Sequence, residues 1–194
     1  WKYMVLPYTE HALVRRVLAN GERARTWNSH LRGIPGLLGS CYLANGNYCD
    51  TQGIASVSMG FRPVSDMELM ITPYGAFPLM LVDRGAGLAW HRAMLARPCM
   101  QCSVGSVESG QAFAEQPKVA RKISWDTKVT ADLAALGGTC GLLAQFLDSD
   151  PEGKMRARFD SLLTWLHETH FSSLEGEATP FAPAPPVAAC DDFD

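Results

Sequence analysis

Short apolar segments separated by turn residues fill the chain from Gly36 to about Trp125. The segments at 67–72, 77–83 and about 88–95 are rich in Val, Leu, Ile, Met and aromatic residues, which is typical of strands. Turn chemistry separates them at Asn45-Gly46, at Pro73-Tyr74-Gly75 and at Arg84-Gly85-Ala86-Gly87. The pattern therefore predicts a meander of antiparallel strands.

Helical spacing replaces this pattern on either side of the meander. Residues 9–21 read as a short helix, with Thr9 as its N-cap and Asn20-Gly21 as its stop. Further along, Asp150-Pro151 is expected to open a helix. Its apolar side chains share one stripe: Met155, Phe159, Leu162 and Leu166.

A longer apolar stripe precedes that helix, with spacings of three and four that predict a helix of its own. Its members are Val129, Leu133, Leu136, Cys140, Leu143 and Leu147. Each interior glycine at 137, 138 and 141 costs roughly 1 kcal/mol relative to alanine, so the helix should depend on tertiary packing. The stripe is either core or an interface between subunits or domains, and we expect a homodimer that uses Val129, Leu133, Leu136, Leu143 and Leu147.

Charge and composition exclude some classes of partner. The 194 residues carry a net charge of -3 with a pI near 6.0, so no broad basic surface is available for nucleic acid. No apolar run approaches the ~20 residues that span a bilayer, and the first residues lack the apolar stretch of a secretion signal. Because the chain starts at Trp1, we expect it to be a fragment of a longer protein.

Six scattered cysteines do not form the dense framework of a small secreted scaffold, which favours a reducing compartment. The one metal candidate combines Cys99-x-x-Cys102 with His167-x-x-His170, since two thiolates and two imidazoles complete a tetrahedral zinc site. Sixty-four residues separate the two pairs, and the alternative is that they are unrelated. No nucleophile elbow, phosphate-binding loop or H-E-x-x-H motif is present, so no catalytic residues are assigned.

The stretches "GLLGSCYLANG" and "GIASVSMGFRPVSDMELMITPYGAFPLMLVDRGAG", with Trp27 just upstream, resemble the polo box. In that family six antiparallel strands are followed by a helix that packs across the sheet. The resemblance thus implies an α+β fold, an antiparallel meander of about six strands packed by one or two C-terminal helices. It divides the chain into a lead-in helix at 1–35, a divergent polo-box-like domain or two polo boxes at 36–172, and a Pro-rich tail at 173–194.

The resemblance also assigns a binding cleft to Trp27, Asp66, Glu68 and Leu69. Polo-like kinases bind phosphopeptides through a His-x-Lys pair at the position of Asp66-x-Glu68. Two carboxylates there would repel a phosphate group, so the expected module does not read phosphopeptides.

The implied function is a non-catalytic interaction domain that targets a larger, kinase-bearing protein to kinetochores or centrioles during the cell cycle. Its partners would be other proteins and a second copy of itself, with no nucleic acid, membrane or cofactor. The expected location is the nucleus and kinetochore, with the centriole or cytoplasm as alternatives. A second hypothesis is a metal-binding or thiol-dependent enzyme domain that uses Cys99, Cys102, His167 and His170.

Overall fold

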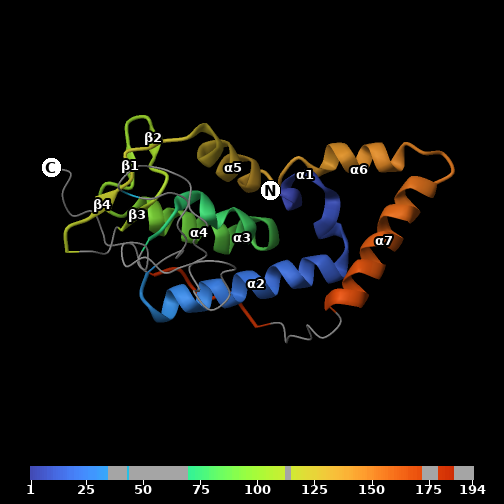
Figure 1. Ribbon diagram of the computed structural model, residues 1–194, viewed down its shortest axis with the longest axis horizontal. Coiled ribbons are helices and arrows are strands. Elements are labelled where there is room, and N and C mark those ends of the chain that lie inside the picture. Colours follow the sequence, from blue (N-terminus) through green and yellow to red (C-terminus); the bar gives the residue numbers. More distant parts are fainter. Residues whose placement is uncertain (35–42, 44–69, 112–114, 172–178, 186–194) are drawn as a thin grey trace.

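The computed structural model describes residues 1–34, 43, 70–111, 115–171 and 179–185 (Figure 1). Helices dominate these residues. Their bounds are α1 Lys2–Val5, α2 Ala12–Leu31, α3 Phe77–Val82, α4 Arg84–Leu95, α5 Trp125–Ala135, α6 Cys140–Asp148 and α7 Lys154–Phe171, with short 3-10 helices η1 Pro7–Glu10 and η4 Pro73–Ala76.

The described strands are four two-residue segments in two antiparallel ladders. Gln101–Cys102 (β1) pairs with Gly105–Ser106 (β2), and Gly110–Gln111 (β3) pairs with Lys118–Val119 (β4). The predicted α+β meander of about six strands is therefore wrong, because two of its expected strands are the helices α3 and α4. The predicted Asn45-Gly46 hairpin lies outside the described residues.

The expected hairpin turn after residue 83 is instead the start of helix α4. The Asp83 carboxylate accepts a hydrogen bond from the backbone N–H of Ala86 at 2.8 Å, which caps the helix. Buried Gly87, Trp90 and Met94 then follow at helical spacing. A Cβ on Gly87 would come within 2.5 Å of Met80, so this glycine lets α3 and α4 approach closely.

Helix α2 runs past the expected stop at Asn20-Gly21 and ends at Leu31. Its second half buries polar side chains, namely Glu22, Thr26 and Ser29. The helical period continues there in polar residues, which explains why a search for apolar spacing ends the helix ten residues early.

The predicted helix from Val129 to Leu147 is divided in two. Gly137 and Gly138 have φ angles of +94° and +82°, and their N–H groups bond back to the carbonyls of Ala134 and Leu133, which is a Schellman ending for α5. Helix α6 then departs at 60° to α5. No described helix is by itself long and apolar enough to cross a membrane, although α5 and α6 taken together pass that test of length and hydropathy.

The main core lies where α1, α3, α4, α5 and the strand region meet. Its fully buried members include Ile71, Met94 and Met100, with Met4 from the N-terminus and Ala134 from α5. Helices α6 and α7 lie at the other end of the molecule from the strands and form a corner with η1 and α2 (Figure 1). We call α6 and α7 the arm.

The described part of the Pro-rich tail, residues 179–185, lies on the chain's own surface. The Trp90 indole N–H donates to the Ala182 carbonyl at 2.9 Å, and Ala182 itself is buried with Trp90 and Leu79. The Arg23 guanidinium covers the Phe181 ring at 4.8 Å from its centroid. The sequence left open whether this tail docks in cis or in trans, and these residues dock in cis.

We expect Gly138→Ala to lower the free energy of unfolding by about 2 kcal/mol or more. Its φ of +82° disfavours any side chain, and a Cβ would lie 2.7 Å from the Met4 carbonyl oxygen. Gly141→Ala in α6 is the matched control, because nothing lies within 4 Å of its added Cβ, and it should stabilise by up to about 1 kcal/mol. Urea unfolding measures both, and equal effects would contradict the prediction.

Candidate functional site

An open groove of about 460 Å³ lies along the exposed side of α4 next to β1. That volume is within the range of small-molecule sites, ~300–1,000 Å³. Its lining combines apolar side chains with three polar ones: Leu88, His91, Arg92, Leu95, Ala96 and Gln101.

The polar side chains of the groove suit a ligand rich in hydroxyl groups. His91 Nδ1 lies 2.9 Å from the Pro73 carbonyl oxygen. Because a carbonyl only accepts, Nδ1 carries the hydrogen in this contact, and Nε2 is the ring nitrogen left for a ligand. Arg92 adds guanidinium donors and Gln101 an amide, while Leu88 and Leu95 offer apolar contact. None of the described lining residues is acidic, so what this part of the groove offers a ligand is hydrogen-bonding and apolar contacts.

Two carboxylates are buried among the described residues, and both are held in place by protein groups. Glu22 on α2 pairs with Arg25 at 2.5 Å, and the same Arg25 nitrogen reaches the Gly75 carbonyl at 2.6 Å. This pair therefore connects α2 to η4. A guanidinium that is shared between a carboxylate and a carbonyl has a structural role.

The second buried carboxylate, Glu108, connects the strand region to the start of α5. Its Oε2 accepts from the hydroxyls of Ser124 and Thr127, each at 2.5 Å. Ser124 is also the N-cap of α5 and accepts the N–H of Thr127. The positive end of the helix dipole and two hydroxyl donors therefore stabilise a negative charge at this position.

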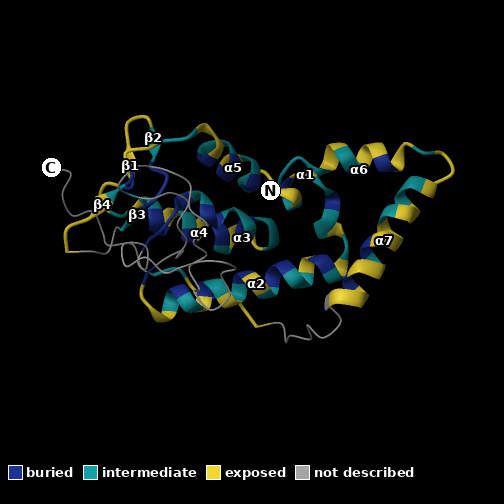
Figure 2. Ribbon diagram, in the orientation of Figure 1, coloured by how far each residue is buried: buried dark blue, intermediate teal, exposed yellow. Residues whose placement is uncertain are grey.

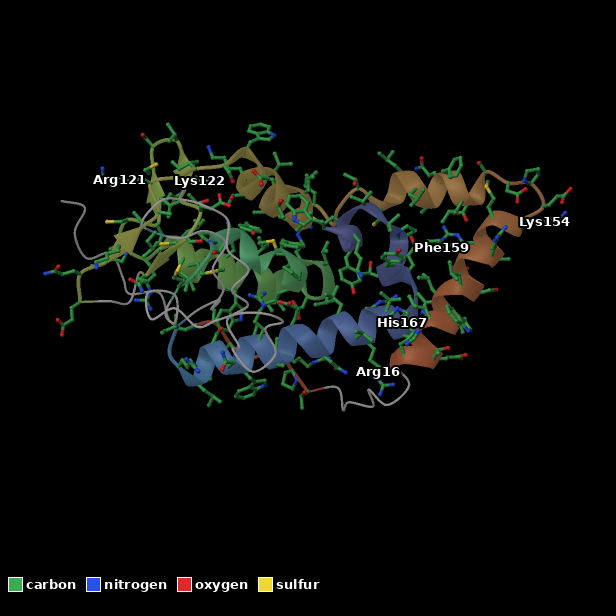
Figure 3. All side chains as sticks on the ribbon, in the orientation of Figure 1. Arg16, Arg121, Lys122, Lys154, Phe159 and His167 are labelled. Atoms are coloured by element: carbon green, nitrogen blue, oxygen red, sulfur yellow. The ribbon has the colours of Figure 1, made fainter. Side chains whose placement is uncertain are left out.

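A second cavity of about 90 Å³ lies between α1, η1, α2 and α7, and it includes Tyr3, Tyr8 and His167 among its lining residues. The His167 ring stacks on His11 with 6.3 Å between centroids. Burial, with the neighbouring His11 and Lys2, lowers the pKa of His167 from its usual 6.5. Figure 3 shows His167 where α7 meets α2.

The proposed zinc ligands do not come together. Cys99 and Cys102 are exposed at the strand end of the molecule, whereas His167 and His170 lie on α7 at the opposite end (Figure 1). No cluster of three or more His, Cys, Asp or Glu side chains in the described part of the chain could hold a metal ion. The metal-site hypothesis is wrong for these four residues.

The cleft residues implied by the resemblance are only partly described. Trp27 lies on α2 with 43% of its surface exposed and stands edge-on to His30. Asp66, Glu68 and Leu69 lie outside the described residues.

The structure distributes the predicted interface stripe over two helices. Leu147 is buried, Val129, Leu133 and Leu143 are half-buried, and Leu136 is 77% exposed. Self-association through this stripe stays a prediction.

The sequence pattern did not indicate the groove residues His91 and Arg92, because it placed them on a strand. The signal that could have found them is the Asp83 cap followed by Gly87, Trp90 and Met94 at helical spacing.

Comparison with known proteins identifies the class of the protein. The family model that matches residues 1–193 is that of Endo-beta-1,2-glucanase SGL, which is a class of glycoside hydrolases. Since the match spans nearly the whole sequence, the chain belongs to this family, glycoside hydrolase family 162. Among curated protein sequences, none matches the chain significantly.

Two solved structures support this assignment. Both are of the endo-beta-1,2-glucanase from Talaromyces funiculosus, one in complex with sophorose and one a mutant in complex with beta-1,2-glucan. Each has 31% sequence identity and a TM-score of 0.75 over 97% of this chain. The match covers 39% of the Talaromyces chain, so this chain spans well under half of the enzyme's length.

These findings correct the functional expectations. The polo-box resemblance is wrong, and with it the non-catalytic targeting function, the kinase and cell-cycle context, and the location at kinetochores or centrioles. The family is one of enzymes, and it suggests a secreted or extracellular protein. The polo-box resemblance rested on apolar runs of about six residues, and at that length strands and short buried helices have similar sequence patterns.

We expect the free energy of unfolding to fall as the pH drops from about 7.5 to 5.5, because the unfolded chain binds a proton at His167 before the folded chain does. His167→Phe should reduce this dependence while keeping a ring against His11. The exposed His170 on the same helix is the control, and His170→Phe should leave the dependence unchanged. Denaturant titrations across this pH range test the expectation, and identical slopes in the wild type and His167→Phe would contradict it.

Proposed function

We propose that the protein carrying this chain hydrolyses internal linkages of β-1,2-glucan. The observation that carries this proposal is the family match over residues 1–193. The solved relative bound to beta-1,2-glucan supports the same substrate. Because the chain spans 39% of that relative, the activity belongs to the chain together with the remainder of the glucanase fold.

Glycosidic bond cleavage ordinarily needs two carboxyl groups, one that protonates the leaving oxygen and one that activates water or attacks the sugar. The two buried carboxylates in the described residues, Glu22 and Glu108, are engaged by Arg25 and by two hydroxyls. We assign them to holding the scaffold. The role that we propose for the α4 groove is binding of glucan, with Arg92, His91 and Gln101 hydrogen-bonded to sugar hydroxyls.

The direct test incubates a polypeptide that joins this chain to the remainder of the glucanase fold with linear β-1,2-glucan. We expect a rapid fall in polymer length and short oligosaccharides as products, measured by chromatography and mass spectrometry. β-1,3-Glucan under the same conditions is the control and should remain intact. A folded protein that leaves β-1,2-glucan intact, or releases only glucose from chain ends, would refute the proposal.

We expect Arg92→Ala to raise KM for β-1,2-glucan about 3- to 10-fold with little change in kcat, because one hydrogen bond from this exposed side chain to substrate contributes about 1 kcal/mol to both bound states. Arg84→Ala is the matched control: Arg84 begins the same helix, is exposed, and is not among the groove residues. Initial rates over a range of substrate concentrations separate KM from kcat. An unchanged KM in Arg92→Ala, or an equal rise of KM in both variants, would show that the groove does not bind the substrate.

A further inference from the structure

The arm exposes more than half of each of four large apolar side chains, two on each of its helices. They are 72% exposed at Leu142, 59% at Phe146, 59% at Leu162 and 57% at Trp165. We call these four the outer arm face. Figure 2 shows exposed surface along α6 and α7. A concentration of this kind marks an interaction surface in a protein.

Helix α6 carries apolar side chains over more than half of its circumference, and its two polar or charged side chains, Gln145 and Asp148, lie in the remaining sector. Its inner side is covered, since Leu147 is buried and Leu143 is half-buried. Its other side carries Leu142 and Phe146, four positions apart, in solvent. The apolar sector of α6 is therefore wider than the part that the rest of the structure covers, and its uncovered part is suited to contact with further protein.

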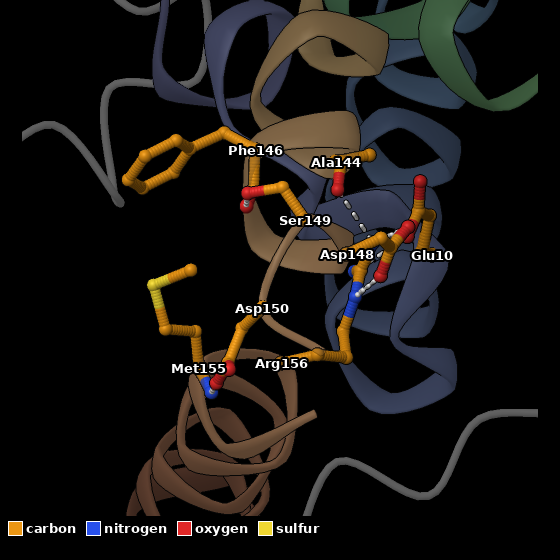
Figure 4. A network of polar contacts seen from close by, with 8 residues as sticks. All are labelled: Glu10, Ala144, Phe146, Asp148, Ser149, Asp150, Met155 and Arg156. Atoms are coloured by element: carbon orange, nitrogen blue, oxygen red, sulfur yellow. Dashed lines mark hydrogen bonds and ion pairs between the residues drawn. The ribbon is translucent and has the colours of Figure 1, made fainter. Parts of the chain in front are cut away.

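Helix α7 is likewise covered by the rest of the structure on one side only. Its apolar stripe begins half-buried at Met155 and Phe159 and continues exposed at Leu162. Leu162 comes seven residues after Met155, which is within about 20° of it around the helix. Figure 4 shows Met155 and Phe146 on one side of the turn between α6 and α7, with the Arg156 network on the other.

Polar and aromatic contacts join the two helices of the arm to each other and to η1. Arg156 bonds Asp148 at 2.8 Å and Glu10 at 2.9 Å, which ties α7 to α6 and to η1. The Asp148 hydrogen bond raises the pKa of Arg156, and the same bond lowers the pKa of Asp148. Phe159 stacks on Tyr8 with 5.8 Å between ring centroids, which also joins α7 to η1.

The similarity to the Talaromyces enzyme points to what covers the face. The superposition includes 97% of this chain, so it extends over the arm, at a TM-score of 0.75. The greater part of the Talaromyces chain lies outside the match. That enzyme therefore combines an arm of this kind with additional chain that can pack on it.

We infer that the outer arm face is the surface on which the remainder of the glucanase fold packs. The contact would bury Leu142, Phe146, Leu162 and Trp165 against apolar side chains of that remainder. This inference rests on the family assignment and the geometry of the arm, and it does not depend on the proposed activity.

Hydroxyl-radical footprinting tests the inference by comparing the 194-residue chain alone with a polypeptide that joins it to the remainder of the glucanase fold. Oxidation of Phe146 and Trp165, resolved by mass spectrometry, should be at least about fivefold slower in the longer polypeptide, because residues in the centre of an interface lose contact with water. Trp125, 78% exposed at the start of α5, is the reference and should react equally in both. Equal oxidation of Phe146 and Trp165 in both proteins would overturn the inference.

A substitution provides an independent readout. Phe146→Glu should lower the melting temperature of the longer polypeptide by several degrees, because it places a charge in an apolar contact. The same change in the 194-residue chain should leave its helical signal and melting temperature unchanged, since the side chain is exposed there. Trp125→Glu is the matched control and should change neither protein. An unaffected Phe146→Glu variant of the longer polypeptide would contradict the inference.

The same footprinting experiment distinguishes two other occupants of the outer arm face. Protection of Phe146 and Trp165 in the 194-residue chain alone, with a doubled mass in sedimentation, would assign the face to a second copy. Protection that requires lipid vesicles would assign it to a membrane surface. Either result overturns the inference. Protection in the longer polypeptide without glucan hydrolysis would leave the inference intact and refute the proposed function.

Discussion

The carbonyl oxygen of Met4 fixes the course of the second half of the chain. It accepts from the Thr139 N–H at 2.7 Å and from the Thr139 hydroxyl at 3.2 Å, directly after α5 ends at Gly137-Gly138. Only a residue without a side chain fits at 138, because that carbonyl lies so close. The resulting 60° bend directs α6 away from the core, and the arm exists as a consequence of this one contact.

Buried polar contacts hold the other end of the structure together. The Glu22–Arg25 pair connects α2 to η4, and Glu108 connects the strand region to the start of α5. Such groups add little net stability when they are paired, yet removing one partner leaves a buried polar group unsatisfied and is costly. They fix which elements meet, while the apolar core between Ile71, Met94 and Met100 supplies the driving force.

Local signals in the sequence predicted some features and misled on others for identifiable reasons. The predicted start at Asp150-Pro151 is too early, since α7 begins at Lys154. The Asp150 carboxylate nevertheless accepts from the Met155 N–H at 3.0 Å, and its backbone hydrogen bonds with Met155 and Glu152 lower its pKa. Asp83 was read as a turn residue, because the six-residue apolar run before it fits a strand as well as a short helix. Gly137-Gly138 was read as a weakness within a helix, although two glycines followed by Thr139 also fit a helix end and a new start. The groove could not be predicted, because it depends on α4 and β1 coming together.

The positions of the carboxylates determine which roles the described part of the molecule can have. A hydrolase must keep a carboxyl group close to the glycosidic oxygen and able to exchange a proton. In the described residues Glu22 is held by a guanidinium and Glu108 by two hydroxyls at a helix start, while the groove has no acidic lining. The buried carboxylates among the described residues therefore hold elements of the fold together, and the role that we propose for the α4 groove is binding. The outer arm face, whose large apolar side chains are exposed, is the surface on which we infer that further chain packs.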